Sequence, residues 1–495
     1  MAEEISAQSN TNDIWMDDQA CEKARLSRDS RFDGKFYTAV LTTGIFCRPI
    51  CPARPPKSEN VRYYPNAIQA QQAGFQPCKR CIPEQAPALS LPVKMKQITQ
   101  ALENSDSSIA TLAQQFDISE RQLNRLFIKE FGVAPSKFLH HQRLLLARKL
   151  ITTTALPITD VCFAAGFQSI RRFNEAIKKA YLCTPSELRK NKKVSTDKNT
   201  VTVLLPYRPP FDWPLMLSFL RHRQMSNVEQ VTEQSYARVF QIDEIQGWLE
   251  VTHHKSKQAL VLQVHMSDYK CLSQVINNVK RMFDLDADMN AIHNQLKQNP
   301  LLAKVISTYP GLRLPGCWDI FEFSIRAILG QQISVKAATT YAARIATRYG
   351  KTSIENPYGL TNVFPSWKEL QHAEYEELGF TKARIATLKV WLAFYQHNQD
   401  IFYTYSSVAD LEKTLTQLKG IGPWTVNYIA MRGLSDPDAF PSADLGIIKA
   451  LTTTTYGETN KPSNKDILAM AEQWRPWRAY AAIYLWHSLS LNNNN

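Results

Sequence analysis

Apolar residues recur at helical spacing along most of this chain and alternate as in β-strands over one limited stretch. From about 93 to 189 the apolar positions lie three and four apart, with no strand alternation. β-Branched alternation appears within 201–285, mixed with helical pieces, and helical spacing returns from about 290. There we expect helices over Phe321–Tyr349, Ala383–Tyr395, Leu411–Gln417, Val426–Leu434 and Ala479–Leu489. The pattern therefore predicts a multidomain, mainly α protein with one α+β part.

The first helical region contains an internal repeat at an offset of fifty residues. Ser119–Phe131 aligns with Ser169–Tyr181, and the dipeptide Pro135-Ser136 recurs at 185–186. In each repeat a short helix, expected over 109–116 or 158–165, precedes a turn and a second helix that a serine can cap. The second helix has one apolar face and one basic face. In a helix-turn-helix unit the apolar face packs on the core and the other face enters the major groove of DNA.

The basic faces of the second helices supply the candidate DNA-reading residues. Arginine and asparagine suit bidentate contacts to guanine and adenine edges, and the candidates are Arg121, Arg125, Arg171, Arg172 and Asn174. A plain helical bundle with solvated basic faces is the alternative. The motif Ala164-Ala-Gly-Phe167, followed by Ser169 and a basic helix, resembles the second reading head of AraC-type regulators. That resemblance covers the whole paired-motif domain and implies an all-α DNA-binding domain.

Two close pairs of cysteines, Cys47 with Cys51 and Cys78 with Cys81, precede the repeat. Two short turns with this spacing can bring four thiolates to one tetrahedral Zn²⁺ ion. A purely structural zinc site is the commoner meaning of such spacing. Here Arg48, Arg54, Lys57, Lys79 and Arg80 crowd the cysteines with positive charge, so a nucleophilic thiolate that meets DNA is a second interpretation.

The segments TTGIFCRPIC and AGFQPCKRC, which contain these cysteines, resemble the methyl-accepting domain of the bacterial Ada response regulators. The resemblance implies a small zinc-bound α/β domain in which Cys47 accepts a methyl group from a DNA methylphosphotriester. Cys51, Cys78 and Cys81 would complete the zinc site, while Thr43 and Arg54 would position the DNA backbone. Methylation of one of four thiolates on Zn²⁺ changes the formal charge from −2 to −1, so repulsion of phosphates falls.

A glycine-punctuated turn, Leu418–Thr425, lies between helical stretches near the C-terminus. Gly420 and Gly422 permit a tight hairpin whose backbone N–H groups can face a phosphate. About twenty residues further lies Asp444, which could simply cap a helix. Hairpin and aspartate together resemble the helix-hairpin-helix DNA glycosylases, and FSIRAILGQQIS (323–334) with WRPWRAY (474–480) narrows the resemblance to AlkA-type 3-methyladenine glycosylases.

The AlkA-type resemblance covers about 200–490 and implies a role for particular residues. Asp444 would stabilise the developing oxocarbenium charge and orient water at the sugar, while Trp424, Tyr428 and Trp486 match pocket positions for the extruded base. Each aromatic residue could equally belong to a core. Gln332 stands where an apolar wedge could fill the vacated base stack, which is a departure from the family pattern.

Three absences from the sequence refine this function. Bifunctional relatives place a lysine where this chain has Trp424, so we expect a monofunctional enzyme that leaves an abasic site. Cys271 and Cys317 are the only cysteines beyond residue 200, too few for an iron–sulfur cluster. The sequence also lacks Pro-Cys-His-Arg, the mark of the O6-methylguanine acceptor that usually closes Ada proteins.

Composition agrees with a DNA partner. The net charge is +13, and residues 1–198 hold 29 Lys and Arg against 19 Asp and Glu, a net charge of +10. Such a basic region points to a polyanion, although a merely basic surface gives the same count. The acidic N-terminus resembles no export signal, and no eighteen-residue apolar run exists, so we expect a bacterial cytoplasmic, nucleoid-associated protein with no membrane span.

These observations predict four domains: a zinc-binding methyl acceptor over 10–85, a tandem helix-turn-helix over 93–190, an α+β domain over 200–285 and an all-α helix-hairpin-helix domain over 290–491. We expect a monomer that senses DNA alkylation, activates transcription with RNA polymerase and excises alkylated purines from double-stranded DNA. One alternative is a transcription regulator whose glycosylase fold only binds DNA, without catalysis. Another is a zinc-stapled repair enzyme whose helix-turn-helix pair only adds affinity.

Overall fold

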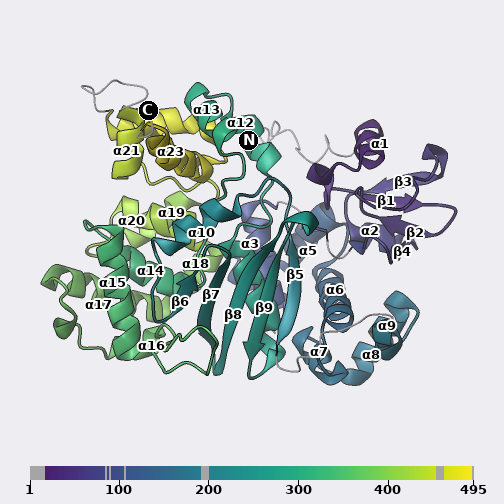
Figure 1. The fold of residues 1–495 in the computed structure, drawn as a ribbon, viewed down its shortest axis with the longest axis horizontal. Coiled ribbons are helices and arrows are strands. Elements are labelled where there is room, and N and C mark those ends of the chain that lie inside the picture. The colour runs from purple at the N-terminus through teal and green to yellow at the C-terminus, as the bar shows by residue number, and fades with distance from the viewer. Residues whose placement is uncertain are drawn as a thin grey trace.

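The computed structural model describes residues 17–83, 86–87, 91–104, 108–190, 200–452 and 462–492. In Figure 1 a large antiparallel sheet lies at the centre, with the first part of the chain on one side and the C-terminal helices on the other. The expected first domain begins at residue 10, and its first seven residues lie outside the described part. The fold is multidomain and mainly helical, as the sequence predicts.

The N-terminal part is a four-stranded sheet flanked by two helices, which we call the zinc module (residues 17–83). Its strand order is β3-β1-β2-β4, with β2 and β4 parallel and the other pairs antiparallel. Tyr37, Ala39, Phe46, Ala70 and Phe75 form a small core beneath the sheet. Its elements are α1 Asp18–Ser27, β1 Tyr37–Val40, β2 Ile45–Cys47, β3 Val61–Tyr64, α2 Ala67–Gln72 and β4 Gln76–Pro77.

Helices follow throughout the second part. Ser119 caps α5 in a capping box with Gln122, and Ser169 caps α8, so both expected serine caps are confirmed. The helix α5 ends at Gly132 in the left-handed conformation, whereas α8 ends at Leu182 with φ 56°. The helices are α3 Val93–Asn104, α4 Ile109–Gln115, α5 Glu120–Phe131, α6 Pro135–Thr153, α7 Ile158–Ala164, α8 Ile170–Tyr181 and α9 Pro185–Lys190.

The central sheet has the order β5-β9-β8-β7-β6 and is antiparallel throughout. Burial alternates strictly along β5, because one face packs on the core and the other does not. The expected α+β character is therefore confirmed. The elements are β5 Val201–Pro206, α10 Trp213–Arg221, β6 Glu229–Val231, β7 Ser235–Ile242, β8 Ile245–His254, β9 Ala259–Met266 and α11 Leu272–Met282.

The C-terminal part packs helices around one large core that includes Trp391, Trp474 and Tyr484. The helices are α12 Met289–Leu296, α13 Pro300–Thr308, α14 Ile320–Leu329, α15 Val335–Tyr349, α16 Trp367–Gln371, α17 Lys382–His397, α18 Ile401–Thr404, α19 Val408–Leu415, α20 Pro423–Tyr428, a π-helix Ile429–Gly433, α21 Leu445–Leu451, α22 Asn464–Ala471 and α23 Arg478–Asn492. Short 3₁₀ turns span Ser30–Phe32, Ser58–Asn60, Lys255–Lys257, Tyr269–Cys271, Glu376–Leu378 and Glu472–Trp474.

One expected helix is wrong. The sequence pattern predicts a single helix over Phe321–Tyr349, but the chain turns between α14 and α15 at 330–334. Gln332 adopts a left-handed conformation with φ 59°, which an α-helix does not accommodate. Ser334 then caps α15 through its side chain, so the apolar spacing on both sides belongs to two helices rather than one.

The parts of the chain share cores instead of packing separately. Ile68 of the zinc module packs with the first helix-turn-helix unit, around Leu123 and Phe127. The second unit joins the central sheet, since Cys162 and Val201 belong to one cluster. The second helices of the two units, α5 and α8, therefore belong to different cores.

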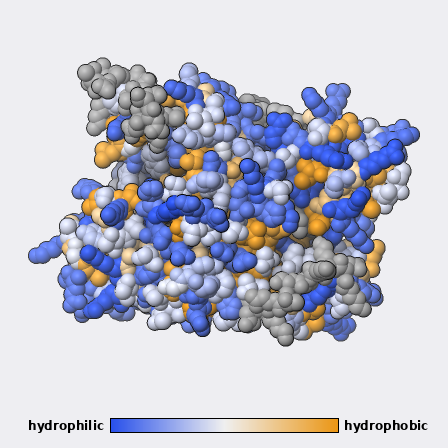
Figure 2. All heavy atoms as spheres, viewed as in Figure 1, coloured by the Kyte–Doolittle hydropathy of each residue, from blue (hydrophilic) through white to orange (hydrophobic). Residues whose placement is uncertain are grey.

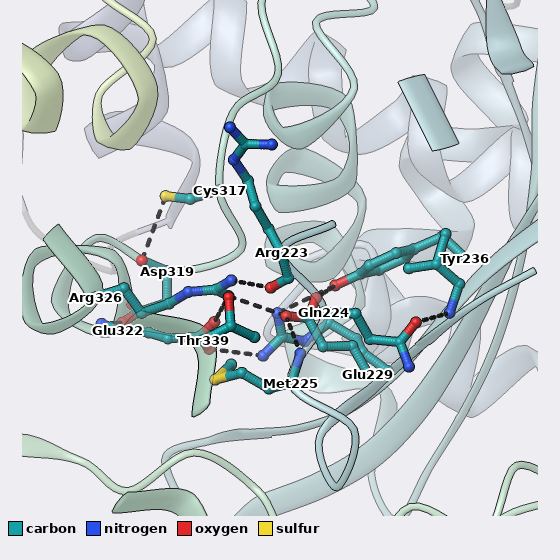
Figure 3. Close-up of polar contacts among 12 residues, drawn as sticks. Arg223, Gln224, Met225, Glu229, Tyr236, Cys317, Asp319, Glu322, Arg326 and Thr339 are labelled. Carbon is teal, nitrogen blue, oxygen red and sulfur yellow. Dashed lines mark hydrogen bonds and ion pairs between the residues drawn. The ribbon is translucent and has the colours of Figure 1, made fainter. Parts of the chain in front are cut away.

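A buried network of charges ties the central sheet to the C-terminal helices (Figure 3). Arg238 on β7 lies 2.7 Å from Glu322 on α14, and Arg326 lies 2.9 Å from Glu229 on β6 and 3.3 Å from Glu322. Arg326 also donates to the backbone oxygen of Arg223, just after α10. Paired and hydrogen-bonded in this way, the charges are tolerated in the interior.

No helix among the described residues is both long enough and apolar enough to cross a membrane. On the face drawn in Figure 2, apolar residues form small patches between hydrophilic ones and no continuous band.

Candidate metal centre and active site

The parallel pairing of β2 with β4 brings the two cysteine pairs together. Phe46 lies opposite Pro77, and the amide of Cys78 donates to the oxygen of Phe46 at 3.0 Å. Cys47 ends β2 and Cys78 follows β4, so each pair occupies the turn at the end of its strand. The ligand atoms of Cys47, Cys51, Cys78 and Cys81 all lie within 4.8 Å of one another. Zinc–sulfur bonds of about 2.3 Å fit a cluster of this size.

Backbone amides donate to two of the four sulfur atoms, which favours negative charge on those two. The amide of Arg48 donates to Cys81 Sγ at 3.3 Å, and the amide of Arg80 donates to Cys78 Sγ at 3.4 Å. Cys47 and Cys51 are half-buried, whereas Cys78 and Cys81 are buried. A nucleophile must reach its substrate, so the structure restricts the accessible thiols to Cys47 and Cys51.

The candidate phosphate-positioning residues of the zinc module, Thr43 and Arg54, are both exposed. Arg48 behaves differently from the other cations near the cysteines. It forms an ion pair with Asp33 and donates to the carbonyl oxygen of Cys81 at 3.3 Å. The Arg48 charge therefore points into the zinc module rather than toward DNA. The sequence pattern does not predict the ion pair between Arg48 and Asp33, because the two residues are fifteen positions apart.

The five candidate DNA-reading residues of the helix-turn-helix units are all exposed: Arg121, Arg125, Arg171, Arg172 and Asn174. Leu123 and Phe127 on α5, and Phe173 and Ile177 on α8, are buried at the same time. Each second helix therefore keeps its basic face free for a groove. Arg171 pairs with Glu175 at 3.2 Å, and both side chains are largely exposed, so the pair adds little stability.

The hairpin glycines near the C-terminus differ in what they require. Gly420 has φ 89°, and a Cβ atom there would clash with the hydroxyl of Thr387. Gly422 precedes α20 with φ −104°, and a Cβ atom there would meet nothing within 4 Å. Gly420 therefore shapes the turn, while Gly422 leaves open space beside the backbone, where a phosphate can approach. Gln331, in the turn between α14 and α15, contacts this hairpin by donating to the Gly420 oxygen at 3.0 Å.

Asp444 is the N-cap of α21, and it also receives two indole groups. Its Oδ1 atom accepts hydrogen bonds from the amides of Gly446 and Ile447 at 2.9 and 3.2 Å and from Trp486 Nε1 at 2.8 Å. Its Oδ2 atom accepts one from Trp424 Nε1 at 3.2 Å. The interpretation of Asp444 as a helix cap is thus confirmed. Two tryptophan donors from separate helices exceed what a cap needs.

The three candidate base-pocket residues come together around this carboxylate. The rings of Trp424 and Tyr428 are stacked, with centroids 5.1 Å apart and an interplanar angle of 12°. Trp486 reaches the same carboxylate from α23. All three side chains are half-buried, so they are neither fixed entirely inside the core nor free in solvent.

Sequence reasoning missed two arginines beside Tyr428. Arg432, on the π-helix, donates to the Tyr428 hydroxyl at 3.1 Å and to the Pro315 oxygen at 2.9 Å. Burial alone would raise the pKa of Tyr428, but the charges of Arg432 and Arg223 outweigh burial and lower that pKa. A π-turn often occurs where a helix must re-aim a functional side chain, yet the sequence carried no signal for it.

Comparison with known proteins agrees with this arrangement. Residues 20–84 match the family described as the metal binding domain of Ada, 112–191 match a helix-turn-helix domain, and 202–319 match the AlkA N-terminal domain. The chain is 36% identical over 487 residues to a probable bifunctional transcriptional activator/DNA repair enzyme AlkA of Mycobacterium tuberculosis, covering 96% of this chain and 97% of that one. The chain belongs to this family of fused Ada–AlkA proteins.

Two further comparisons concern the C-terminal half. DNA-3-methyladenine glycosylase 2 of Escherichia coli is 32% identical over 288 residues, which cover 57% of this chain and 96% of that protein. The fold of a 3-methyladenine DNA-glycosylase from Archaeoglobus fulgidus superposes with a TM-score of 0.51 at 20% identity, over 57% of this chain and 96% of that one. The chain is thus a DNA-binding DNA repair enzyme with a zinc-binding domain.

Proposed function

We propose that this protein repairs DNA alkylation and reports it to transcription. Cys47 accepts a methyl group from a methylphosphotriester in DNA, and the methylated protein then binds promoters through its tandem helix-turn-helix units. The C-terminal half hydrolyses the N-glycosidic bond of alkylated purines such as 3-methyladenine. The observation that carries the enzymatic part is the Asp444 carboxylate, which two indoles and two amides hold beside a stacked aromatic pair.

For the methyl transfer, the thiolate sulfur of Cys47 attacks the methyl carbon. The new S–C bond forms as the C–O bond breaks, and the phosphodiester leaves with the electron pair. Bound Zn²⁺ keeps the thiols ionised at neutral pH, and a thiolate is the nucleophile. Thr43 and Arg54, both exposed and within four residues of an accessible cysteine along the chain, hold the DNA backbone. Cys51 is also half-buried, and we propose that it accepts no methyl group.

The methylated module binds DNA more tightly because one negative charge is removed from a surface that faces phosphates. The charge of a protein surface that faces DNA phosphates strongly changes the affinity for DNA, and the size of this effect depends on the salt concentration. We propose that the exposed arginines of α5 and α8 then select the promoter. RNA polymerase is the partner of the activator, and the protein acts as a monomer.

For base excision, the target nucleotide leaves the duplex and its base stacks on Trp424 and Tyr428. Asp444 stabilises the positive charge that develops on the sugar and directs the attacking water. Its Oδ1 atom already accepts three hydrogen bonds and its Oδ2 atom one, so Oδ2 keeps capacity for the reacting atoms. The hairpin position that carries a Schiff-base lysine in bifunctional relatives is Trp424, which supports a monofunctional enzyme without strand cleavage.

One experiment with the full-length protein separates these activities. Duplex DNA treated with a methylating agent is incubated with the zinc-loaded protein, and released bases and protein peptides are analysed by mass spectrometry. We expect free 3-methyladenine, abasic DNA without strand breaks and one methyl group on Cys47 with none on Cys51. A protein that binds the DNA and gains the methyl group but releases no base would support the regulator whose glycosylase fold only grips DNA.

A further inference from the structure

The turn Asp33–Lys35 of the zinc module, which we call the docking turn, is held by the glycosylase half of the chain (residues 200–492). Lys35 Nζ lies 2.5 Å from the carboxylate of Asp288, just before α12, and both side chains are almost fully buried. Arg208, which follows β5, donates through Nε to the backbone oxygen of Asp33 at 3.0 Å. It is only 2% exposed. Two cations therefore lie buried at this contact.

Gly34 is required at the centre of the docking turn. It has φ 75°, a left-handed conformation, and a Cβ atom there would clash with the backbone oxygen of Pro87 and meet Arg208 Nη2 at 3.4 Å. Arg208 also donates to the Pro87 oxygen at 3.4 Å and to the Asp286 oxygen at 3.3 Å. The turn thus fits closely against Pro87, which follows the zinc module, and against Arg208 of the glycosylase half.

The docking turn is also joined to the metal centre. The Asp33 carboxylate accepts a hydrogen bond from Arg48 Nε at 2.8 Å, and Arg48 directly follows Cys47. The Arg48 amide in turn lies 3.3 Å from Cys81 Sγ. Asp33 therefore contacts Arg48, the neighbour of Cys47, through its side chain. It contacts Arg208 of the glycosylase half through its backbone oxygen.

Charge balance makes this contact sensitive to the state of the centre. Lys35 pairs with the carboxylate of Asp288 and Arg48 with that of Asp33, while Arg208 donates to the backbone oxygens of Asp33, Pro87 and Asp286. Four thiolates on Zn²⁺ carry a formal −2 beside Arg48, and this negative potential stabilises buried cations. Loss of one thiolate charge weakens that stabilisation where Arg208 and Lys35 are held.

We propose that S-methylation of Cys47 releases the docking turn from the glycosylase half. This inference rests on the proposed acceptor role of Cys47, and it adds a second consequence of methylation besides tighter DNA binding. The unmethylated protein holds its zinc module against the glycosylase half, and the methylated protein frees it. Thr43 and Arg54 are exposed in the docked arrangement, so docking leaves the DNA-facing residues uncovered.

Hydrogen–deuterium exchange of the full-length, zinc-loaded protein tests the docking. We expect Gly34→Ala and Lys35→Met to speed exchange several-fold in peptides that contain residues 30–38, 203–210 and 284–290. Gly74→Ala is the matched control, because Gly74 has φ 91° but a Cβ atom there meets nothing within 4 Å. Lys57→Met removes an exposed ion pair with Glu59 of the same module and is the second control. Equal exchange in all four variants would show that the turn does not dock.

The coupling is tested without relying on methyl transfer from DNA. S-Methylcysteine is installed at position 47 as a noncanonical amino acid, with S-methylcysteine at position 183 as the control, and zinc content is measured in both. We expect exchange at the three peptides to rise several-fold for position 47 only. Unchanged exchange with zinc retained overturns the coupling. If instead wild-type Cys47 takes no methyl group from DNA while the installed S-methylcysteine frees the turn, the acceptor role fails and the coupling stands.

Discussion

Substitution of Asp444 by asparagine and by alanine separates its two roles, as helix cap and as catalytic carboxylate. Asparagine caps helices as well as aspartate does, so it retains the bonds from the Gly446 and Ile447 amides. An amide NH₂ cannot accept from the Trp424 indole, so the variant loses that one hydrogen bond, worth about 1 kcal/mol. We therefore expect Asp444→Asn to fold with nearly unchanged stability.

Alanine removes the cap and both indole acceptors. Loss of an N-cap costs about 1 kcal/mol, and each half-buried indole N–H that loses its acceptor costs about 1 kcal/mol more, at the lower end of the usual range. We expect Asp444→Ala to lose about 3 kcal/mol in the unfolding transition of the C-terminal part. For both variants we expect base release to fall on the order of 10²–10⁴-fold, because each lacks the carboxylate.

The assay measures single-turnover release of 3-methyladenine from duplex DNA, with stability followed by denaturant unfolding. DNA affinity is measured in parallel, since both variants keep the hairpin and the basic helices. If Asp444→Asn retained release within a few-fold of wild type, the carboxylate would be only a helix cap and the enzymatic proposal would be wrong.

Four other substitutions test the fold and the site. Glu322→Gln removes the ion-pair partner of the buried Arg238, while Arg326 keeps Glu229, and it should cost about 3–5 kcal/mol, seen as a lower Tm. An unchanged Tm would show that the network adds nothing. Gly420→Ala should destabilise the hairpin, whereas Gly422→Ala should keep the Tm and weaken DNA binding, and equal effects would contradict the distinction. Burial raises the pKa of Asp284 to about 6, so its contribution to stability is full below about pH 4 and lost as pH rises to about 6. Asp284→Asn should remove that slope of Tm against pH, and a slope that persists in this variant would refute the assignment.

Much of the site could be predicted because its signals are local in the sequence. The four cysteines lie in two short turns, and each turn places its own pair of thiols near the other pair once β2 and β4 are parallel. The serine caps of α5 and α8 depend only on the next three residues. The glycine-rich hairpin likewise carries its geometry in its own sequence.

Other features depend on partners that are remote in the chain. The break at Gln332 was missed because apolar spacing continues through it, while Arg384 and Gly420 hold the neighbouring Gln331 in place. Arg432 reaches Tyr428 only because the π-helix re-aims it. The two indoles at Asp444 come from helices twenty and forty-two residues away, so no local pattern reveals that they share one carboxylate.

The sequence by itself determined the order of the parts, the metal ligands and the basic faces of the reading helices, because spacing and composition specify each of them locally. Only the tertiary structure decided how the parts meet. The two reading heads join different cores, and Asp33 connects the metal loop to Arg208 across 175 residues. Such contacts arise from burial and charge pairing between distant segments, which a linear pattern does not encode.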